Sequence, residues 1–553
     1  MKFTTLFTTL FRDHTDLLGS YNYAKLTLGG DIPEEKKPVP IPFIKTEEQS
    51  TFWEIERFFS YFEKTNLKGL LLIINNLNIG FSRANALRNS LLRVGDAGKK
   101  IYIHLENPGN LEYFIASCAD HLSISPMSTL NFTGLYNESF YLKGLLTKLD
   151  IEPEIQGVGE YKSAAETFTR TGMSESAREM LNSIIDEQFN TIVGNISESR
   201  GISFNKLYKY LDDSPFTPEK AKQYGLIDSI GYEEDLVGIV EEHNNLNLKI
   251  IEQKAVDRII RYSSKISNII SRIKQDTGQI ALVTVNGIIS QGKSQTGSGR
   301  FKTAGSDTII NTLKKIENDG SIRAVVVRIL SPGGSAVASD LIRNKVEHLS
   351  KKKPVYISMS DVAASGGYMA SLSAVSIFAD PFTITGSIGV VAGKLNFKKL
   401  LDRMGVGTEM VTRGRMSSIY SVTKGFTEDE EKKFTEIITS MYEDFVNIVS
   451  RTRNIDRKKT EQASKGRVWT GNQAKQLKLV DKLGGLRETL QLAYDDCGIK
   501  GDIFSRVKVF SHETRFSIES MGKFFGYSWL GSTLNVFEKE RLYALMPFWI
   551  KIR

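Results

Sequence analysis

At 553 residues the chain is too long for one ordinary domain, and we expect about two to four units of about 100 to 200 residues each. Hydrophobic residues make up 41% of the sequence and charged residues 25%, a composition that excludes an intrinsically disordered chain. The formal charge of +8 is modest for this length, and no basic block with interleaved aromatic residues indicates nucleic-acid binding.

Residues 1–60 are predicted to form an N-terminal segment that includes a first strand. The segment begins with the threonine-rich apolar run MKFTTLFTTLFRDHTDLL. This run fits either an interfacial helix at a membrane surface or a helix packed on the protein. No window of the sequence approaches the roughly 18 to 20 uninterrupted apolar residues of a membrane-spanning helix.

The two stretches 61–247 and 279–500 alternate short β-branched runs with amphipathic helical stretches, which is typical of βαβ units in an α/β fold. Between them, residues 248–278 carry apolar residues at helical spacing and predict a connecting helix. Residues 501–553 form an aromatic, basic tail, and both membrane contact and packing on the protein remain open for it.

The two stretches repeat each other, in the same order and at a nearly constant offset, which indicates an internal duplication. The matching segments are GLLLIINNLNIGFSRANALRNSLL from Gly69 with AVVVRILSPGGSAVASDLIRNKVEHL from Ala324, KKIYIHLENPGNLEYFIAS from Lys99 with KKPVYISMSDVAASGGYMAS from Lys352, and TPEKAKQYGLIDSIG from Thr217 with TGNQAKQLKLVDKLG from Thr470. We therefore expect an α/β protein of two tandem domains.

The repeats differ at two positions that matter for chemistry. Ser365 lies opposite Asn110, so the first repeat has no hydroxyl there, and Lys162 lies opposite Ser417, so the second repeat has no lysine there. A serine hydroxyl becomes a good nucleophile only when a base removes its proton. The complementary losses predict one site, built from Ser365 of one repeat and Lys162 of the other.

Lysine is the base that this pattern favours. The chain has six histidines, and only His121, beside Asp120, offers a weak alternative base. A lysine becomes a base at neutral pH only if burial lowers its pKa from about 10.4. The apolar surroundings in YKSAAETF suit such burial, and Ser163 or Ser417 could hydrogen-bond the amine.

Glycines supply the remaining parts of the predicted site. Gly366 follows the serine, while Gly333 and Gly334 lie where a strand meets a helix, so their N–H groups can form an oxyanion hole. The run FTITGSIGVV predicts a strand on which an extended peptide substrate could pair. The residues of that predicted substrate strand are Gly386, Ser387, Ile388 and Gly389.

Together these motifs resemble the long, tandem-repeat form of the signal peptide peptidase A family. The resemblance covers roughly residues 60 to 500 and rests on SPGGS at 331–335, AASGGYMAS, TGSIGV at 385–390, GVGEYKSAAETF and GRVWTGNQAKQLKLVD at 466–481. It implies a Clp-protease-like, crotonase-related fold and a serine endopeptidase with Ser365 as nucleophile and Lys162 as general base. It also implies that the enzyme degrades released signal peptides and forms a membrane-attached oligomer, typically a tetramer.

The resemblance implies no cofactor and no metal, and Cys118 and Cys497 match no metal-ligand spacing. Family members usually carry an N-terminal membrane anchor, which does not stand out here, so we expect peripheral contact with the cell membrane, with a soluble form as the alternative. Two other functions stay open. One is a crotonase-type acyl-CoA enzyme that uses the same glycine N–H groups, and the other is a catalytically dead membrane scaffold.

Overall fold

The structure is a computed structural model that describes residues 20–36, 50–256, 258, 278–296, 302–499, 502–510 and 543–545. The first repeat is built on a parallel sheet with the strand order β6-β4-β3-β2-β1-β7. Its strands are β1 (Tyr23–Gly30), β2 (Gly69–Leu77), β3 (Lys100–Leu105), β4 (His121–Ile124), β6 (Ser229–Ile230) and β7 (Ile250–Glu252). Unbroken apolar runs such as GLLLII in β2 are buried on both faces, as parallel sheets require.

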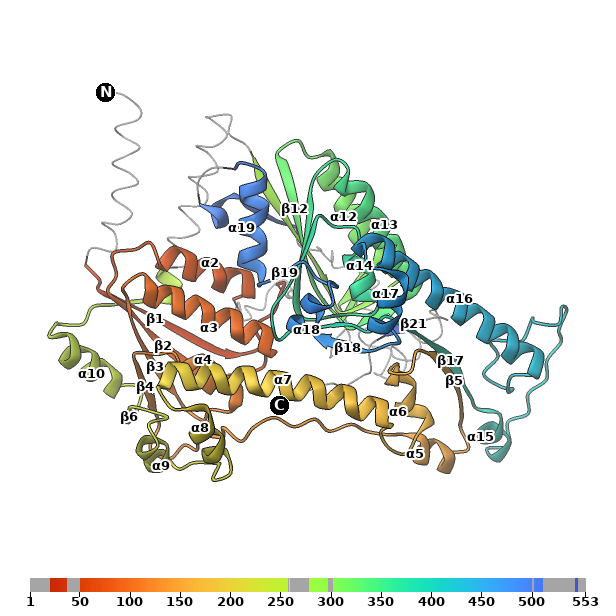
Figure 1. The fold of residues 1–553 in the computed structure, drawn as a ribbon, viewed down its shortest axis with the longest axis horizontal. Helices are drawn as coiled ribbons and strands as arrows, with labels where there is room; N and C mark the ends of the chain where they lie inside the picture. The colour runs from red at the N-terminus through yellow and green to blue at the C-terminus, as the bar shows by residue number, and fades with distance from the viewer. Residues whose placement is uncertain are drawn as a thin grey trace.

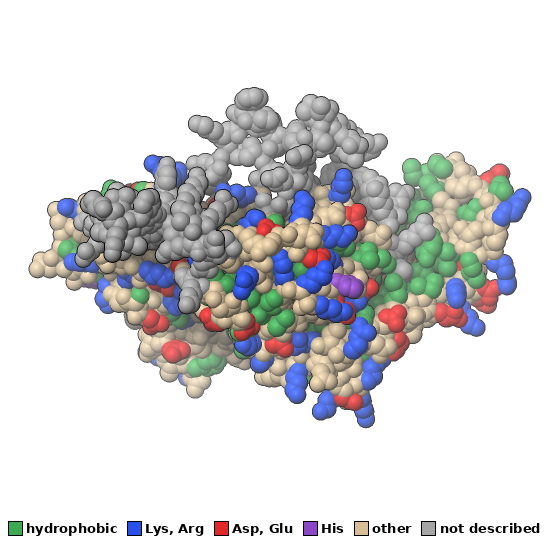
Figure 2. Space-filling model, turned by 90° about the horizontal axis from the view of Figure 1, so that it is seen from above, with side chains coloured by type: hydrophobic (Ala, Val, Ile, Leu, Met, Phe, Trp, Pro, Cys, Tyr) green, Lys and Arg blue, Asp and Glu red, His purple; other side chains and the backbone are tan. Residues whose placement is uncertain are grey.

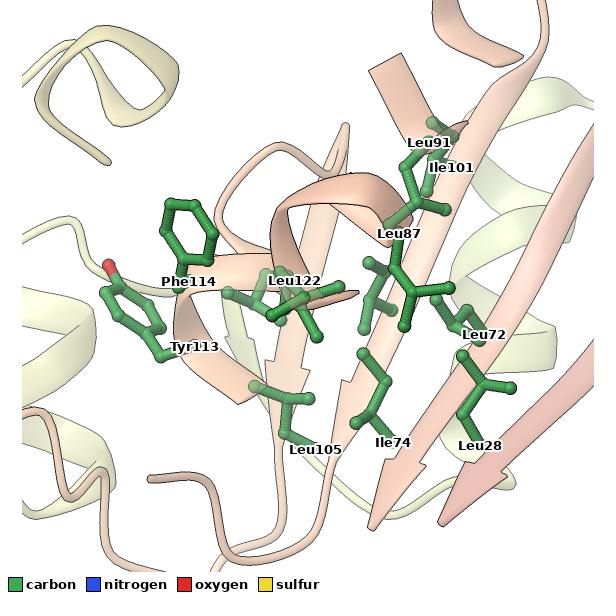
Figure 3. Close-up of a cluster of buried hydrophobic side chains, with 14 of the residues drawn as sticks. Leu28, Leu72, Ile74, Leu87, Leu91, Ile101, Leu105, Tyr113, Phe114 and Leu122 are labelled. Atoms are coloured by element: carbon green, nitrogen blue, oxygen red, sulfur yellow. The ribbon is translucent and has the colours of Figure 1, made fainter. Parts of the chain in front are cut away.

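Three helices pack against this sheet: α2 (Phe52–Phe62), α3 (Phe81–Asp96) and α4 (Asn110–Ala116). Figure 3 shows how the core forms between them, with Leu87 and Leu91 of α3 lying over Leu72 and Ile74 of β2. These side chains are essentially inaccessible to solvent. Because this packing leaves α3 rigid on the sheet, the turn at its start is a fixed platform for contacts with the second repeat.

The second repeat repeats the plan around a larger sheet with the order β18-β16-β14-β12-β8-β20, extended by β15 and β19. Its strands are β8 (Gln279–Asn286), β12 (Ile322–Ser331), β14 (Val355–Ala364), β15 (Ser376–Ala379), β16 (Ile384–Gly386), β18 (Val468–Thr470), β19 (Lys482–Leu483) and β20 (Val507–Phe510). The helices α12 (Ser306–Asn318), α13 (Ala336–Ser350) and α14 (Gly366–Ser371) belong to the same repeat.

A third sheet joins the repeats, with the order β10-β11-β9-β13-β21-β17-β5. Strand β5 (Glu152–Val158) of the first repeat pairs antiparallel with β17 (Val390–Asn396) of the second repeat over its whole length. The other strands of this sheet are β9 (Ile288–Ser290), β10 (Gln295–Thr296), β11 (Lys302–Gly305), β13 (Gly333–Ser335) and β21 (Tyr543–Leu545). The two repeats are therefore continuous through backbone hydrogen bonds at this sheet.

Two long helices also correspond between the repeats, α7 (Glu175–Arg200) and α16 (Glu428–Arg453). Helix α7 runs from the first repeat beneath the second (Figure 1), and its Met180 and Ile184 join a small core with Ala364 and Val468. The remaining helices are α5 (Lys143–Lys148), α6 (Glu166–Thr169), α8 (Phe204–Leu211), α9 (Pro218–Gln223), α10 (Asp235–Asn244), α15 (Lys398–Arg403), α17 (Arg457–Ala463), α18 (Gly471–Gln476) and α19 (Leu486–Asp496), with short 3₁₀ turns η1 (Ser163–Ala165) and η2 (Ile503–Arg506).

The structure confirms the α/β class and the tandem arrangement and corrects two details. Within the predicted connecting helix 248–278, Ile250–Glu252 is a strand that pairs with β1. Within the predicted tail, Val507–Phe510 pairs with β8 as a strand. The predicted interfacial helix at the N-terminus and most of the tail lie outside the described residues. Among the helices that are described, none is both long and apolar enough to cross a membrane.

Candidate active site

Lys162 and Ser365 meet inside the protein, although they come from different repeats. The amine Nζ of Lys162 lies 2.8 Å from Ser365 Oγ. Both side chains are buried, with Lys162 4% and Ser365 0% exposed. The two residues with complementary losses in the duplication are thus in direct hydrogen-bond contact.

Ser365 stands at the turn where β14 ends and α14 begins. Its φ is 55° and its ψ is −115°, an uncommon conformation for a residue with a side chain. The backbone N–H of Ser365 donates to Gly386 O at 2.7 Å, which holds this turn against β16. Gly367 lets the turn pass close to β12, because a Cβ there would lie 2.8 Å from Ser331 O.

Lys162 follows β5 and is enclosed by glycines of the second repeat. A Cβ on Gly466 would lie 2.6 Å from Lys162 Cβ, and a Cβ on Gly389 would lie 3.1 Å from Lys162 Cδ. The lysine therefore fits only because these two positions lack side chains. Burial in this enclosure lowers the pKa of Lys162 well below its ordinary value of 10.5, because the charged form loses its hydration.

Ser387 is the residue that completes the surroundings of the amine. Lys162 Nζ lies 3.0 Å from Ser387 O and 3.0 Å from Ser387 Oγ. A neutral amine has two N–H groups and one lone pair. With its two hydrogens donated to Ser387, its lone pair faces the hydroxyl of Ser365, which is the arrangement that removes a proton from a serine.

The structure gives the two predicted supporting serines other positions. Ser417 is exposed and its Oγ donates to Gly414 O at 2.8 Å, so it does not hydrogen-bond the amine as predicted. Ser163 is half-buried in η1, and its backbone N–H donates to Tyr161 O at 2.8 Å. The sequence analysis assigns Ser387 to a substrate strand instead of to the amine. The feature that could have indicated its role is its hydroxyl within the TGSIG turn, which contacts Lys162.

Part of the backbone of the predicted substrate strand at 386–389 is already hydrogen-bonded within the protein. Gly386 O accepts from Ser365 N, and Ser387 N donates to Arg467 O at 2.7 Å. Ile388 O accepts from Gly466 N at 2.8 Å, and Gly389 is packed against Lys162. The N–H of Ser387 is therefore not available to an incoming peptide, whereas strand pairing at Ile388 and Gly389 stays a prediction.

The glycines predicted for an oxyanion hole lie on β13 and at the start of α14. Gly333 and Gly334 have φ values of 109° and 152°, which L side chains rarely adopt. The N–H of Gly333 donates to Ser331 Oγ at 3.2 Å. It can stabilise a developing oxyanion only if this hydrogen bond is bifurcated or broken. Gly366 opens α14, where the first N–H groups have no acceptor within the helix.

His121, the alternative base, lies on β4 in the sheet of the first repeat. Its Nε2 shares a hydrogen bond of 2.8 Å with Ser229 Oγ. Burial lowers the pKa of His121, with Asp228 opposing this shift. These contacts make His121 part of the packing of the first repeat.

The sequence is similar to known peptidases along most of its length. The model of Peptidase family S49 matches residues 93–247 and 347–500. Serine protease SPPA, chloroplastic, from Arabidopsis thaliana is 28% identical over 80% of this chain and 65% of its own length. Protease 4 from Haemophilus influenzae is 31% identical over 77% of this chain and 70% of its own length. The chain thus spans just under two thirds of the plant relative.

Among solved structures, the chain is similar to a mutant of ClpP1 from Listeria monocytogenes. The likeness covers 40% of this chain and 98% of that chain, with 16% sequence identity and a TM-score of 0.25.

Replacing Lys162 tests its ionisation through stability. A lysine whose pKa is lower in the folded state binds fewer protons there than in the unfolded state, so its contribution to stability rises with pH between the two pKa values. We expect the melting temperature of the wild type, minus that of Lys162→Met, to increase from pH 7 toward pH 10, since one pKa unit corresponds to about 1.4 kcal/mol. Lys249→Met, at an exposed position, is the control for removing a lysine from the surface. A flat difference for Lys162→Met would mean an ordinary lysine.

Proposed function

We propose that this chain, which belongs to peptidase family S49, is a serine endopeptidase with Ser365 as nucleophile and Lys162 as general base. The observation that carries the proposal is the 2.8 Å contact between a buried amine and a buried hydroxyl. A surface lysine next to a serine would be protonated and could not act as a base, whereas the enclosure of Lys162 favours the neutral form.

The geometry supports an acyl-enzyme mechanism. Lys162 Nζ takes the proton of Ser365 Oγ–H as the oxygen attacks the peptide carbonyl carbon, and the resulting oxyanion is stabilised by backbone N–H groups at Gly366 and on β13. The protonated Lys162 then gives its proton to the leaving amine, and the acyl group remains on Ser365. Water, deprotonated by Lys162, releases the acid and restores the serine. Ser387 keeps the amine directed at Ser365 throughout.

The substrate is proposed to bind as an extended strand between β13 and β17. Support comes from β21, which occupies that position in this structure and pairs antiparallel with both neighbours. Its residues pair with Gly333, Gly334 and Ser335 on one side and with Val391 on the other. A peptide in the same position would lie along the proposed oxyanion glycines, and its backbone would supply most of the recognition.

Signal peptides released from preproteins are the proposed substrate class, together with other small apolar peptides. Backbone pairing tolerates many sequences, which suits a peptidase that acts on varied apolar peptides. This assignment also follows the sequence resemblance to the signal peptide peptidase A family. Peripheral membrane contact stays a prediction, because the segments expected to provide it lie outside the described residues.

We also propose that the chain forms a homo-oligomer, with a tetramer as the expected state. An exposed apolar surface at one end of the molecule supports this, and we call it the end surface: Met404, Val406, Met410, Val411 and Val422. Figure 2 shows hydrophobic side chains gathered at the right-hand end, where α15 lies in Figure 1. Val411 is 88% exposed and Met404 67%, which is unfavourable unless another surface covers them.

The dyad is tested by three single substitutions. Ser365→Ala and Lys162→Met should each lower kcat/KM for an apolar peptide by at least about a thousandfold, because removing either member of a nucleophile–base pair loses the whole pathway. Ser387→Ala should lower it about tenfold, since one hydrogen bond contributes about 1 kcal/mol and the amine loses its orientation. The control is Ser417→Ala, whose hydroxyl lies away from the amine and whose activity should stay within about twofold of the wild type. Ordinary turnover by purified, folded Ser365→Ala would disprove the dyad.

Strand pairing is tested with N-methylated peptides. A strand paired on both edges uses successive N–H groups alternately toward its two neighbours, so methylating any of several consecutive residues should raise KM about tenfold or more. The unmethylated peptide of the same sequence is the matched control. A penalty at every second residue only would indicate pairing with one neighbour, and no penalty at any residue would exclude binding as a strand.

The oligomer is tested by placing charge on the end surface. Val411→Glu combined with Met404→Glu should lower the native mass measured by light scattering, because a buried unpaired carboxylate disfavours association. Val375→Glu, at another exposed valine in the loop between α14 and β15, is the control and should leave the mass unchanged. A wild type that is monomeric at micromolar concentration would contradict the proposal directly.

A further inference from the structure

A stacked cluster of side chains lies beside the proposed dyad and takes no part in the chemistry. The guanidinium of Arg467 lies between two aromatic rings, with its Cζ 4.8 Å from the centre of Tyr161 and 4.6 Å from that of Trp469. The Arg467 side chain is only 14% exposed. A planar guanidinium between two rings gains both cation–π attraction and stacking, which a lysine ammonium would not reproduce.

The cluster connects the two repeats. Tyr161 belongs to the first repeat and immediately precedes Lys162, whereas Arg467 and Trp469 belong to the second. Glu179 on α7 closes the cluster, since it pairs with Arg467 Nη1 at 2.6 Å and accepts from Tyr161 Oη at 3.1 Å. The Glu179 side chain is 59% exposed, so this ion pair itself contributes little.

The backbone beneath Arg467 forms the wall of the lysine enclosure. Tyr161 N–H donates to Lys465 O at 2.8 Å, and Ser387 N–H donates to Arg467 O at 2.7 Å. Gly466 lies between these two hydrogen bonds. It is packed directly against Lys162, since a Cβ on Gly466 would lie 2.6 Å from Lys162 Cβ. Residues 465–467 therefore contact Lys162 and hydrogen-bond Ser387, which orients its amine. The Arg467 side chain holds this segment against the ring of Tyr161, the residue before Lys162.

We propose that Arg467 is a positioning residue, which by stacking on Tyr161 and Trp469 holds the 465–467 backbone against Lys162 and Ser387 and keeps water from the amine. The inference rests on the proposed function. Burial is what lowers the pKa of Lys162, so the role of Arg467 is to keep the enclosure closed and not to act as a nearby charge. If the wall loosens, water reaches the ammonium form and its pKa rises.

Several ionisable groups surround this cluster and could contribute to the dependence of kcat/KM on pH. Glu179 lies on α7, and Glu160 pairs with Lys465 at 3.6 Å. Tyr442 on α16 donates to Glu461 on α17 at 2.6 Å and accepts from Lys465 N–H. Carboxylates, lysines and tyrosines ordinarily titrate outside about pH 6 to 9. Burial raises the pKa of Asp380 to about 7, so the base is identified by a limb that moves in the Arg467 variants and not by its position alone.

The experiment measures kcat and KM against pH for Arg467→Met and Arg467→Lys. We expect both variants to lower kcat at pH 7 about tenfold, to leave KM within about threefold, and to move the rising limb of kcat/KM to higher pH by at least about half a unit. Glu179→Gln, which keeps the stack, should stay within about twofold. Arg403→Met, which removes another ion pair between the repeats at 2.7 Å from Asp150, is the matched control and should leave the limb in place.

The outcomes separate the role of stacking from simpler ones. A lower kcat with an unmoved limb would overturn the proposal, because a general loss of structure does not change the base. Wild-type behaviour of Arg467→Lys would overturn it as well, since charge alone would then suffice. If Ser365→Ala is inactive and the Arg467 profiles do not move, only this inference fails. If Ser365→Ala stays active, the proposed function itself fails.

Discussion

One hydrogen bond of 2.8 Å imposes the main constraint on this molecule, because its two partners are 203 residues apart and lie in different repeats. A misplacement of about 1 Å can lower a rate about a hundredfold, so the relative placement of the repeats is part of the site. Backbone pairing of β5 with β17 fixes one side of that placement. Buried polar contacts fix the other, including Asn85 Nδ2 to Asp380 at 2.8 Å and Arg328 to Glu34 at 3.0 Å. The strand pairing and the buried polar contacts between the repeats are therefore required for the proposed dyad.

The duplicated turn shows how one repeat was adapted to serve the other. In the second repeat the SPGGS turn at the start of α13 carries the proposed oxyanion glycines, and in the first repeat the corresponding turn opens α3. There the N–H groups of Gly80 and Arg83 donate to the carboxylate of Asp361, at 3.1 and 3.0 Å, and Arg83 Nε adds a bond of 2.6 Å. A helix N-terminus attracts negative charge in both repeats. Asp361 lies on β14, so the turn without the glycine pair anchors the strand that leads to Ser365, the proposed nucleophile.

Sequence reasoning could find the repeats and the two residues that meet at 2.8 Å, because each repeat lacks one of them: Asn110 stands at the position of Ser365 and Ser417 at that of Lys162. It could not find Ser387 as the partner of the amine, since this depends on a local backbone with φ of 53° that composition does not specify. For a related reason the sequence could not show that part of the predicted substrate strand at 386–389 is already paired within the protein, because glycines near a site do not reveal the partners of their backbone groups. Strand β7 was missed because three residues cannot be distinguished from the helical periodicity around them.

The buried lysine also bears on the rival functions. Holding an amine neutral costs stability, about 1.4 kcal/mol for each pKa unit, and here the enclosure needs glycine at 389 and 466 and an arginine stacked over the adjoining wall. A crotonase-type acyl-CoA enzyme would use the glycine N–H groups and gain nothing from a neutral amine aimed at a serine. A scaffold would be more stable with an apolar side chain in that enclosure. The arrangement is favourable only for a reaction in which the amine takes a proton from Ser365. The unfavourable burial of Lys162 therefore argues for peptidase chemistry more strongly than the short distance between the two side chains does.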